Sequence, residues 1–320
     1  MNISVLGSGF IVNVFVEGVA KFPEYHLRGI WGRHREKIEG FKGFDFYTTD
    51  LDELLNDKEC DVIYVALPNG LHYEYGMKAL KAGKHVIMEK PFCAHYKDAK
   101  KMFDYAKKQN LMVIEAITTR YNPVYLKLKK EIGQLGEIKL IDGNFSQYSR
   151  RYDRFKNGEK LPVFDKKLAG GALLDLNVYN IHFVAGIFGM PKKVMYFPNM
   201  EKGVDTSGVL VLDYGSFKAR LIAAKDCKAN CHVTIQGDEG YLKVKTTASR
   251  CSAYELIRND GNNIICDGED SEFVAWNSEL KKFVDIFEHG RTEEYDEYVA
   301  ESLLTMKIID KALESAKIVY

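Results

Sequence analysis

The chain has 320 residues, 46% of them hydrophobic and 28% charged, which is typical of a globular protein large enough for two hydrophobic cores. Because 45 Lys and Arg balance 45 Asp and Glu, no net charge favours nucleic acid or an anionic membrane as a partner. No apolar run approaches the roughly 20 residues of a membrane span, and the start Met1–Leu6 lacks the basic residues of a signal peptide. The six cysteines have no zinc-ligand spacing, so we expect free thiols, no metal and a cytoplasmic location.

Strand-like and helix-like runs alternate up to about residue 118. The expected strands are Ile3–Gly7, His26–Trp31, Val62–Leu67, His85–Met88 and Met112–Ala116, and the expected helices include Leu51–Leu55, Tyr73–Ala82 and Lys97–Gln109. This alternation is typical of βαβ units. It predicts an α/β fold whose N-terminal part is a doubly wound parallel sheet of the Rossmann type.

The pattern changes near residues 118–122, and strands then follow one another with turn signals between them. We expect helices at Pro123–Leu135, Ala172–Phe188, Glu279–Glu288 and Val299–Ser315, and strands at Ile138–Phe145, Lys193–Tyr196, Gly208–Tyr214, Phe217–Ala224, Cys231–Gln236, Tyr241–Lys245 and Tyr254–Arg258. Successive strands indicate an antiparallel sheet. The sequence therefore predicts two domains, residues 1–120 and an α+β domain over residues 121–320.

A glycine turn follows the first strand. Its residues are Gly7, Ser8, Gly9, Phe10 and Ile11, and Val12 occupies the position where a dinucleotide fingerprint has a third small residue. Glycines at a strand-to-helix turn let backbone N–H groups approach a pyrophosphate, and the helix N-terminus adds positive potential. We expect the turn to bind a dinucleotide; the alternative is a tight turn without a ligand.

The second strand ends in Trp31, Gly32, Arg33 and His34, with no carboxylate before Glu36. A carboxylate at that point binds the free ribose 2′-hydroxyl of NAD, whereas basic side chains suit the 2′-phosphate of NADP. Arg33 and His34 therefore predict NADP as the preferred cofactor over NAD. In the alternative, Arg33 stacks on the adenine ring and discriminates neither cofactor.

A later apolar strand, His85–Met88, stops in Glu89, Lys90 and Pro91. Proline cannot donate to a sheet, so the strand must end there. Ligands of parallel sheets bind outside the carboxyl ends of the strands. Lys90 is therefore a candidate catalytic residue, and the alternative is a solvated lysine at a strand end.

The segment Ala172–Phe188 has little polar surface, so we expect a buried helix. Asp175, Tyr179 and His182 fall at i, i+4 and i+7, which is one stripe of an α-helix. A cationic Lys90 near Tyr179 would lower the pKa of the tyrosine, giving the proton donor and acceptor that alcohol–carbonyl interconversion needs. For His182 a satisfied core position is the stronger interpretation.

Together these motifs resemble the Gfo/Idh/MocA family of oxidoreductases, and most closely its dihydrodiol and NADP-dependent xylose dehydrogenase branch. The resemblance is carried by the glycine turn, Pro68–His72, Ala82–Pro91, Arg120–Pro123 and Gly170–Asp175 with Tyr179. It implies that Lys90, Asp175 and Tyr179 are catalytic and that Leu67, Pro68, Asn69, His72 and Glu89 line the cofactor site, with Arg120 and His182 as tentative substrate residues. It also implies that residues 1–120 bind the dinucleotide, and that an open antiparallel sheet in residues 121–320 mediates formation of a homodimer or homotetramer.

The expected reaction is hydride transfer between NADP or NAD and a CH–OH or C=O carbon of a sugar, cyclitol or dihydrodiol. Tyr179 or Lys90 carries the proton, and Asp175 orients a hydroxyl or the lysine. Two alternatives stay open: a glycosidase that oxidises the sugar transiently with NAD, and a dinucleotide sensor without activity. The basic loop with Arg150, Arg151 and Arg154 either recognises an acidic substrate or is a solvated loop, the second being favoured.

Overall fold

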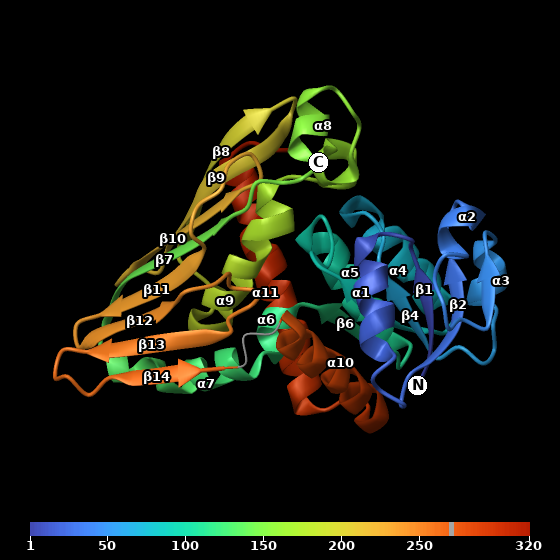
Figure 1. Ribbon diagram of the computed structural model, residues 1–320, viewed down its shortest axis with the longest axis horizontal. Helices are drawn as coiled ribbons and strands as arrows, with labels where there is room; N and C mark the ends of the chain where they lie inside the picture. Colours follow the sequence, from blue (N-terminus) through green and yellow to red (C-terminus); the bar gives the residue numbers. More distant parts are fainter. Residues whose placement is uncertain (269–271) are drawn as a thin grey trace. The chain divides into compact units, whose positions relative to one another are not determined.

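The computed structural model describes residues 1–268 and 272–320 (Figure 1). Its contacts divide the chain into two units, and the first consists of residues 1–116 together with Glu279–Leu303. The second consists of Ile117–Ser278 and Leu304–Tyr320. The division expected from the sequence, at residue 120, places residues 279–303 in the second domain, whereas their contacts place them in the first unit. Helical periodicity does not reveal which sheet a helix will cover.

The first unit contains a six-stranded parallel sheet with the order β3-β2-β1-β4-β5-β6. Its strands are β1 (Asn2–Leu6), β2 (His26–Trp31), β3 (Phe46–Thr48), β4 (Val62–Val65), β5 (His85–Glu89) and β6 (Val113–Ala116). The order reverses direction at β1, so right-handed crossovers place helices on both faces. The predicted doubly wound Rossmann sheet is confirmed, and β3 was missed because three residues are too few for a pattern.

The helices of this unit connect its strands in turn. They are α1 (Phe10–Val19), α2 (Arg35–Ile38), α3 (Leu51–Leu55), the short η1 (Asn69–Leu71), α4 (His72–Lys81) and α5 (Tyr96–Lys108). In α5 the side chains of Ala99, Met102, Phe103 and Ala106 are buried at helical spacing, while its lysines face solvent. Burial of one apolar stripe therefore fixes how this lysine-rich helix covers the sheet.

Two C-terminal helices, α10 (Glu272–His289) and α11 (Glu293–Ser315), contribute to the first unit through residues 279–303. The Tyr25 hydroxyl donates to the carbonyl of Leu280 (2.7 Å). At the edge strand β6, the Tyr295 hydroxyl accepts from the N–H of Val113 (3.0 Å) and donates to its carbonyl (3.1 Å). The tyrosine thus satisfies backbone groups that an edge strand would otherwise leave unpaired.

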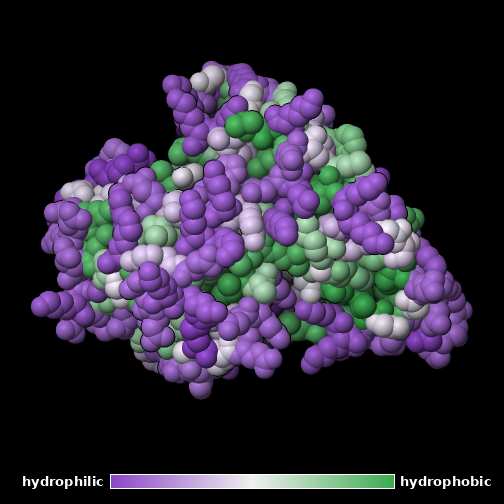
Figure 2. Space-filling view, turned by 180° about the vertical axis from the view of Figure 1, so that it is seen from behind, coloured by the Kyte–Doolittle hydropathy of each residue, from purple (hydrophilic) through white to green (hydrophobic). Residues whose placement is uncertain are grey.

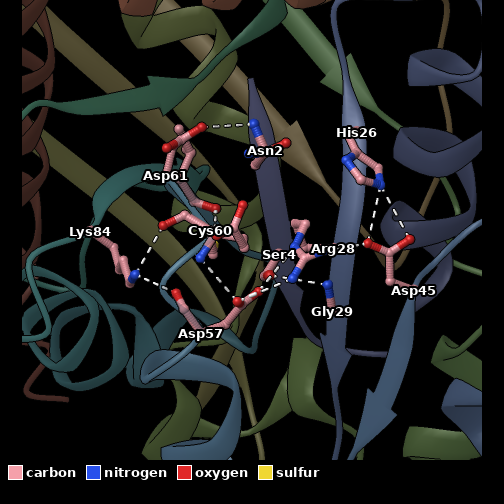
Figure 3. Close-up of polar contacts among 12 residues, drawn as sticks. Asn2, Ser4, His26, Arg28, Gly29, Asp45, Asp57, Cys60, Asp61 and Lys84 are labelled. Carbon is pink, nitrogen blue, oxygen red and sulfur yellow. Dashed lines mark hydrogen bonds and ion pairs between the residues drawn. The ribbon is translucent and has the colours of Figure 1, made fainter.

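Charged side chains tie together the amino ends of the parallel strands (Figure 3). The Arg28 guanidinium donates to Asp57 (3.1 and 3.2 Å) and to Asp45 (2.6 Å). The ammonium of Lys84 donates to the carbonyls of Asp57 (2.6 Å) and Cys60 (2.9 Å). This network stabilises the sheet at the edge opposite to the one where ligands of such sheets bind.

The second unit is built on an eight-stranded sheet with the order β14-β13-β12-β11-β7-β10-β9-β8. Its strands are β7 (Ile138–Ser146), β8 (Lys193–Glu201), β9 (Val204–Asp213), β10 (Lys218–Ala224), β11 (His232–Gly237), β12 (Gly240–Val244), β13 (Ala253–Arg258) and β14 (Ile264–Asp267). β7 and β10 pair in parallel, and the other neighbours pair antiparallel. The predicted mainly antiparallel sheet is confirmed, with β14 as an additional edge strand.

One face of this sheet is covered by a helical segment that begins as a π-helix, η5 (Leu173–Asn177), and continues as α9 (Val178–Phe188). α9 contacts β7 and β10, and Leu173, Leu174, Val178 and Ile181 are fully buried. Within the residues that the structure describes, Lys166–Phe188 is long and apolar enough for a membrane span, but 67% of its apolar window is buried in protein. It is the core helix expected from the sequence.

The remaining helices of this unit are short. They are α6 (Thr118–Tyr121), α7 (Pro123–Glu131), η2 (Ile132–Leu135), α8 (Tyr152–Lys156), η3 (Pro162–Phe164) and η4 (Lys166–Leu168). α7 has Pro123 in its first turn, and the Asn122 side chain caps it by accepting from the N–H groups of Val124 and Tyr125. The sequence signals of proline and asparagine therefore explain where this helix starts.

The opposite face of the eight-stranded sheet carries exposed apolar side chains. In the right-hand part of Figure 2, which holds this sheet, hydrophobic patches lie among hydrophilic side chains. The exposed residues include Leu140, Met195, Phe197, Tyr241 and Ile265, and Phe197 is 59% exposed. Strands of a sheet with one solvent-facing side normally place polar residues there, so the apolar side chains on this face depart from the usual pattern.

Candidate functional site

The glycine turn of the first unit has the geometry of a phosphate-binding loop. Gly7 has a φ of +135°, and a Cβ added to it would lie 2.3 Å from the carbonyl oxygen of Ala66. Gly9 directly precedes α1, and a Cβ added there would meet no atom within 4 Å. Gly7 is thus required by the fold, whereas Gly9 leaves open space at a helix N-terminus. That space fits the pyrophosphate of a dinucleotide.

Val12, the departure from the fingerprint, is completely buried in the core of the first unit. Ser8 and Ile11 are half-buried, while Phe10 is largely exposed beside the glycine turn. The larger side chain of Val12 is therefore accommodated inside the unit, and the open space at Gly9 remains.

The basic residues after β2 lie next to this turn. A Cβ added to Gly32 would lie 3.7 Å from the Cβ of Ser8, which places the start of this loop beside the glycine turn. Arg33 and His34 follow directly and are exposed. Two cationic or ionisable side chains beside a phosphate-binding turn are the arrangement expected for a 2′-phosphate.

Lys90 follows β5 and is partly exposed. The preceding Glu89 is buried; its carboxylate accepts from the Tyr64 hydroxyl (2.5 Å) and from the N–H of Lys90 (3.2 Å). Burial raises the pKa of Glu89, while the hydrogen bond from Tyr64 and the charge of Lys90 oppose that rise. Glu89 thus holds the backbone of Lys90 at the end of the strand.

His72 is fully buried between two loops. Its Nδ1 lies 2.9 Å from the carbonyl of Pro91 and its Nε2 lies 2.8 Å from the carbonyl of Leu67. Burial lowers the pKa of His72, against the two hydrogen bonds, and the charge of Lys90 lowers it further. A neutral imidazole carries one N–H and donates to one of the two carbonyls. The His72 ring therefore lies between the Leu67 and Pro91 segments and donates a hydrogen bond to one of them.

The structure brings the predicted cofactor residues of the first unit to one edge of its sheet. Gly7–Ile11 follow β1, Leu67–Asn69 follow β4, and Glu89 and Lys90 end β5. These three strands are neighbours in the sheet. The carboxyl edge of a parallel sheet beside the point where the strand order reverses is where dinucleotides bind. The residues present therefore fit a nicotinamide dinucleotide.

In the second unit, Asp175 lies within the π-helix η5 and keeps 25% of its side chain exposed. Its Oδ2 accepts from the ammonium of Lys225 at 2.5 Å. The start of η5 is held by Asp205, whose fully buried carboxylate accepts from the N–H of Leu173 (2.7 Å) and from the Tyr196 hydroxyl (2.7 Å). The helical turn that carries Asp175 is therefore fixed at its start by the hydrogen bonds of Asp205.

Sequence reasoning did not find Lys225. It directly follows the apolar strand β10, which is the same signal that singled out Lys90 at the end of β5. The signal had less value here, because antiparallel strands do not gather their carboxyl ends at one edge.

Tyr179 is partly exposed, and its ring centroid lies 5.9 Å from that of Phe145. Of the predicted stripe, Asp175 lies in the π-helical turn, whereas Tyr179 and His182 lie in α9. His182 is buried, with Nδ1 3.2 Å from the Thr305 hydroxyl, as the core interpretation expects. Arg120 is also buried, beside the ring of Tyr121.

The basic loop of the second unit consists of exposed arginines, one of which forms an ion pair within the loop. Arg154 pairs with Glu159, and Arg150 and Arg151 are exposed.

Among the residues placed in the structure, no group of three or more His, Cys, Asp or Glu side chains is arranged to hold a metal ion. All six cysteines are free thiols.

Two family models match the sequence. Residues 1–117 match "Oxidoreductase family, NAD-binding Rossmann fold", and residues 125–243 match "GFO/IDH/MocA C-terminal domain". The chain is also 30% identical over 324 residues to scyllo-inositol 2-dehydrogenase (NADP(+)) IolU of Bacillus subtilis, covering 99% of this chain and 97% of that protein. The chain belongs to the Gfo/Idh/MocA family. It is an NAD(P)-dependent oxidoreductase, as the sequence predicted.

Other similar proteins agree with this assignment. D-xylose 1-dehydrogenase (NADP(+)) 2 of Haloferax volcanii is 28% identical over 273 residues, which are 83% of this oxidoreductase and 81% of that protein. In fold, the chain is similar to the 3-ketoreductase KijD10 of Actinomadura kijaniata, solved with NADP and TDP-benzene, with a TM-score of 0.84 and 21% identity over 98% of this chain and 97% of that one.

Proposed function

We propose that this oxidoreductase interconverts a secondary alcohol or hemiacetal carbon of a sugar or cyclitol with the corresponding carbonyl, using NADP in preference to NAD. The observation that supports this most strongly is the presence of Lys90, Asp175 and Tyr179 in a member of this family. A dinucleotide sensor requires none of these groups. The names of the inositol and xylose dehydrogenases among the relatives support the substrate class.

A nicotinamide dinucleotide held by the glycine turn Gly7–Ile11 and by Leu67–Asn69 would supply or accept the hydride. Tyr179 is proposed to transfer the proton of the reacting hydroxyl, and Lys90 to hold the substrate oxygen. Asp175 accepts a hydrogen bond from a substrate hydroxyl and so fixes the reacting carbon in place. Lys90 as the proton carrier is the alternative assignment.

Arg33 and His34 are proposed to bind the 2′-phosphate of NADP. The test compares kcat/KM for NADPH and NADH in the wild type and in Arg33→Ala. We expect the wild type to prefer NADPH. In Arg33→Ala the ratio of kcat/KM for NADPH to kcat/KM for NADH should fall about tenfold, because one contact to the phosphate is lost. Arg35→Ala is the matched control, because Arg35 is exposed and pairs with Glu39 (2.7 Å). A wild-type preference for NADH would refute the proposal.

A substrate panel of aldoses, inositols and dihydrodiols, followed by NADPH absorbance, tests the substrate class. Turnover of at least one sugar or cyclitol supports the proposal. Cleavage of a chromogenic glycoside without net cofactor turnover would replace it by the glycosidase, and NADP binding without turnover of any substrate would favour the sensor.

The apolar face of the eight-stranded sheet, with Met195 and Phe197, is proposed as the surface through which the chain forms a homodimer or homotetramer. The protein is proposed to act in the cytoplasm. Light scattering of the wild type and of Phe197→Asp tests the first point, and a monomeric wild type would exclude it.

A further inference from the structure

We infer that Lys225 is a positioning residue for Asp175, an inference that rests on the proposed function of Asp175. The ammonium of Lys225 lies 2.5 Å from Oδ2 of Asp175, although the two residues are 50 positions apart. Only 3% of the Lys225 side chain is exposed, against 25% for Asp175. The lysine therefore contacts the carboxylate from its buried side, while part of the carboxylate remains accessible.

The position of the Lys225 ammonium is fixed by further contacts. It donates to the carbonyl of Val163 (3.0 Å) and lies 4.7 Å from the centroid of the Phe164 ring. Phe164 belongs to a hydrophobic cluster and stacks on Phe155, with ring centroids 4.6 Å apart. The ammonium thus has two oxygen acceptors and an aromatic face around it, an arrangement that satisfies a buried cation.

The backbone of Lys225 is equally constrained. Its N–H donates to the carbonyl of Thr206 (2.8 Å), and its carbonyl accepts from the N–H of Ser149 (2.8 Å). Both ends of the side chain are therefore held by neighbouring segments of the same unit. A lysine fixed in this way defines one position for the carboxylate oxygen that it binds.

The chemistry of the pair explains what Lys225 does for the reaction. An adjacent ammonium favours the ionised form of a carboxylate, which can only accept hydrogen bonds. Asp175 is then held as a hydrogen-bond acceptor for a substrate hydroxyl, in one orientation. Loss of the ammonium removes both the charge partner and the orientation, and misplacement of a substrate-positioning group by about 1 Å costs up to about 100-fold in rate.

The experiment compares Lys225→Met, Asp175→Asn and the double variant with the wild type, on a substrate found in the panel. We expect kcat/KM to fall about 10- to 100-fold in Lys225→Met, with the Kd for NADPH unchanged within about twofold. In the Asp175→Asn background the same change should cost less than about threefold, since the carboxylate on which the lysine acts is gone. Lys225→Arg, which keeps the charge, should recover part of the loss.

Lys84→Met is the matched control. Lys84 is also buried, with 8% exposure, and its ammonium donates to the carbonyls of Asp57 and Cys60 in the first unit. Its loss should lower the melting temperature and leave kcat/KM within about twofold of the wild type, because it contacts no group of the proposed mechanism.

The outcomes distinguish a failure of the proposed role of Asp175 from a failure of the positioning role of Lys225. Full activity of Asp175→Asn would refute the proposed role of Asp175 itself. An inactive Asp175→Asn beside a fully active Lys225→Met, or equal losses on Lys225→Met in both backgrounds, would overturn the positioning role alone. If Lys225→Met does not fold, the double variant, which leaves no unpaired charge, and Lys225→Arg carry the same comparison.

Discussion

The two glycines of the cofactor turn should respond to alanine in opposite ways. Gly7 has a φ of +135° and its added Cβ lies 2.3 Å from the Ala66 carbonyl oxygen, whereas Gly9 has a φ of −85° and its added Cβ meets nothing within 4 Å. A methyl group therefore clashes with the protein at Gly7 and meets no protein atom at Gly9. We expect Gly7→Ala to unfold the first unit more readily, and Gly9→Ala to weaken cofactor binding.

The magnitude for Gly7→Ala follows from two costs. A non-glycine residue in a backbone region reserved for glycine costs about 1–3 kcal/mol. The Ala66 carbonyl must also shift to relieve the 2.3 Å contact, at a cost of about 1–3 kcal/mol for overpacking. A loss of about 3 kcal/mol corresponds to a fall of about 6–12 °C in melting temperature for a unit of this size.

For Gly9→Ala the free energy of unfolding should rise slightly, by about 0.4–1 kcal/mol, because alanine restricts the unfolded chain and fits the native φ. NADPH affinity should fall about tenfold or more, since the methyl group occupies the space where the pyrophosphate approaches the backbone. Circular dichroism melts and NADPH fluorescence titrations measure both quantities. Unchanged NADPH affinity in Gly9→Ala, or an unchanged melting temperature in Gly7→Ala, would refute the reasoning.

Three further changes test separate parts of the molecule. Tyr179→Phe should lower kcat about 100-fold or more and remove a limb of the pH–rate profile; unchanged turnover would assign the proton to Lys90. Burial acts to raise the pKa of Asp57, but the hydrogen bonds from Arg28 and the N–H of Glu59, together with the charges of Arg28 and Lys84, outweigh it and lower the pKa. Asp57→Asn should therefore cost about 1–3 kcal/mol near neutral pH, and the difference from wild type in chemical denaturation should begin to shrink near pH ~4 and continue to shrink as the pH falls through the lowered pKa; a constant difference would contradict this. Tyr320→Phe removes a hydrogen bond to buried Asp205 (3.2 Å) and should lower the melting temperature by about 2–4 °C, which an unchanged melt would disprove.

The two sheets could be predicted because their strands are apolar runs separated by helix-like segments in the first domain and by turn signals in the second. β3 and β14, with three and four residues, give too little pattern to be recognised. The π-helix η5 was missed for a different reason, since the hydrophobic spacing of Leu173, Leu174 and Val178 also satisfies an α-helix.

Individual charged residues of the site could be predicted from their places in the sequence, but their partners could not. Asp175 stands out as a carboxylate in an apolar helix, where the buried part of a carboxylate requires a hydrogen-bond donor. Both Lys90 and Lys225 directly follow an apolar strand, but only Lys90 was singled out, and 50 residues separate Asp175 from Lys225, which it contacts. The contact between η5 and β10 within the second unit brings Lys225 to Asp175. An acid in an apolar helix is therefore a reason to examine every lysine that follows an apolar strand, and the strand that the helix contacts identifies a lysine that binds the acid.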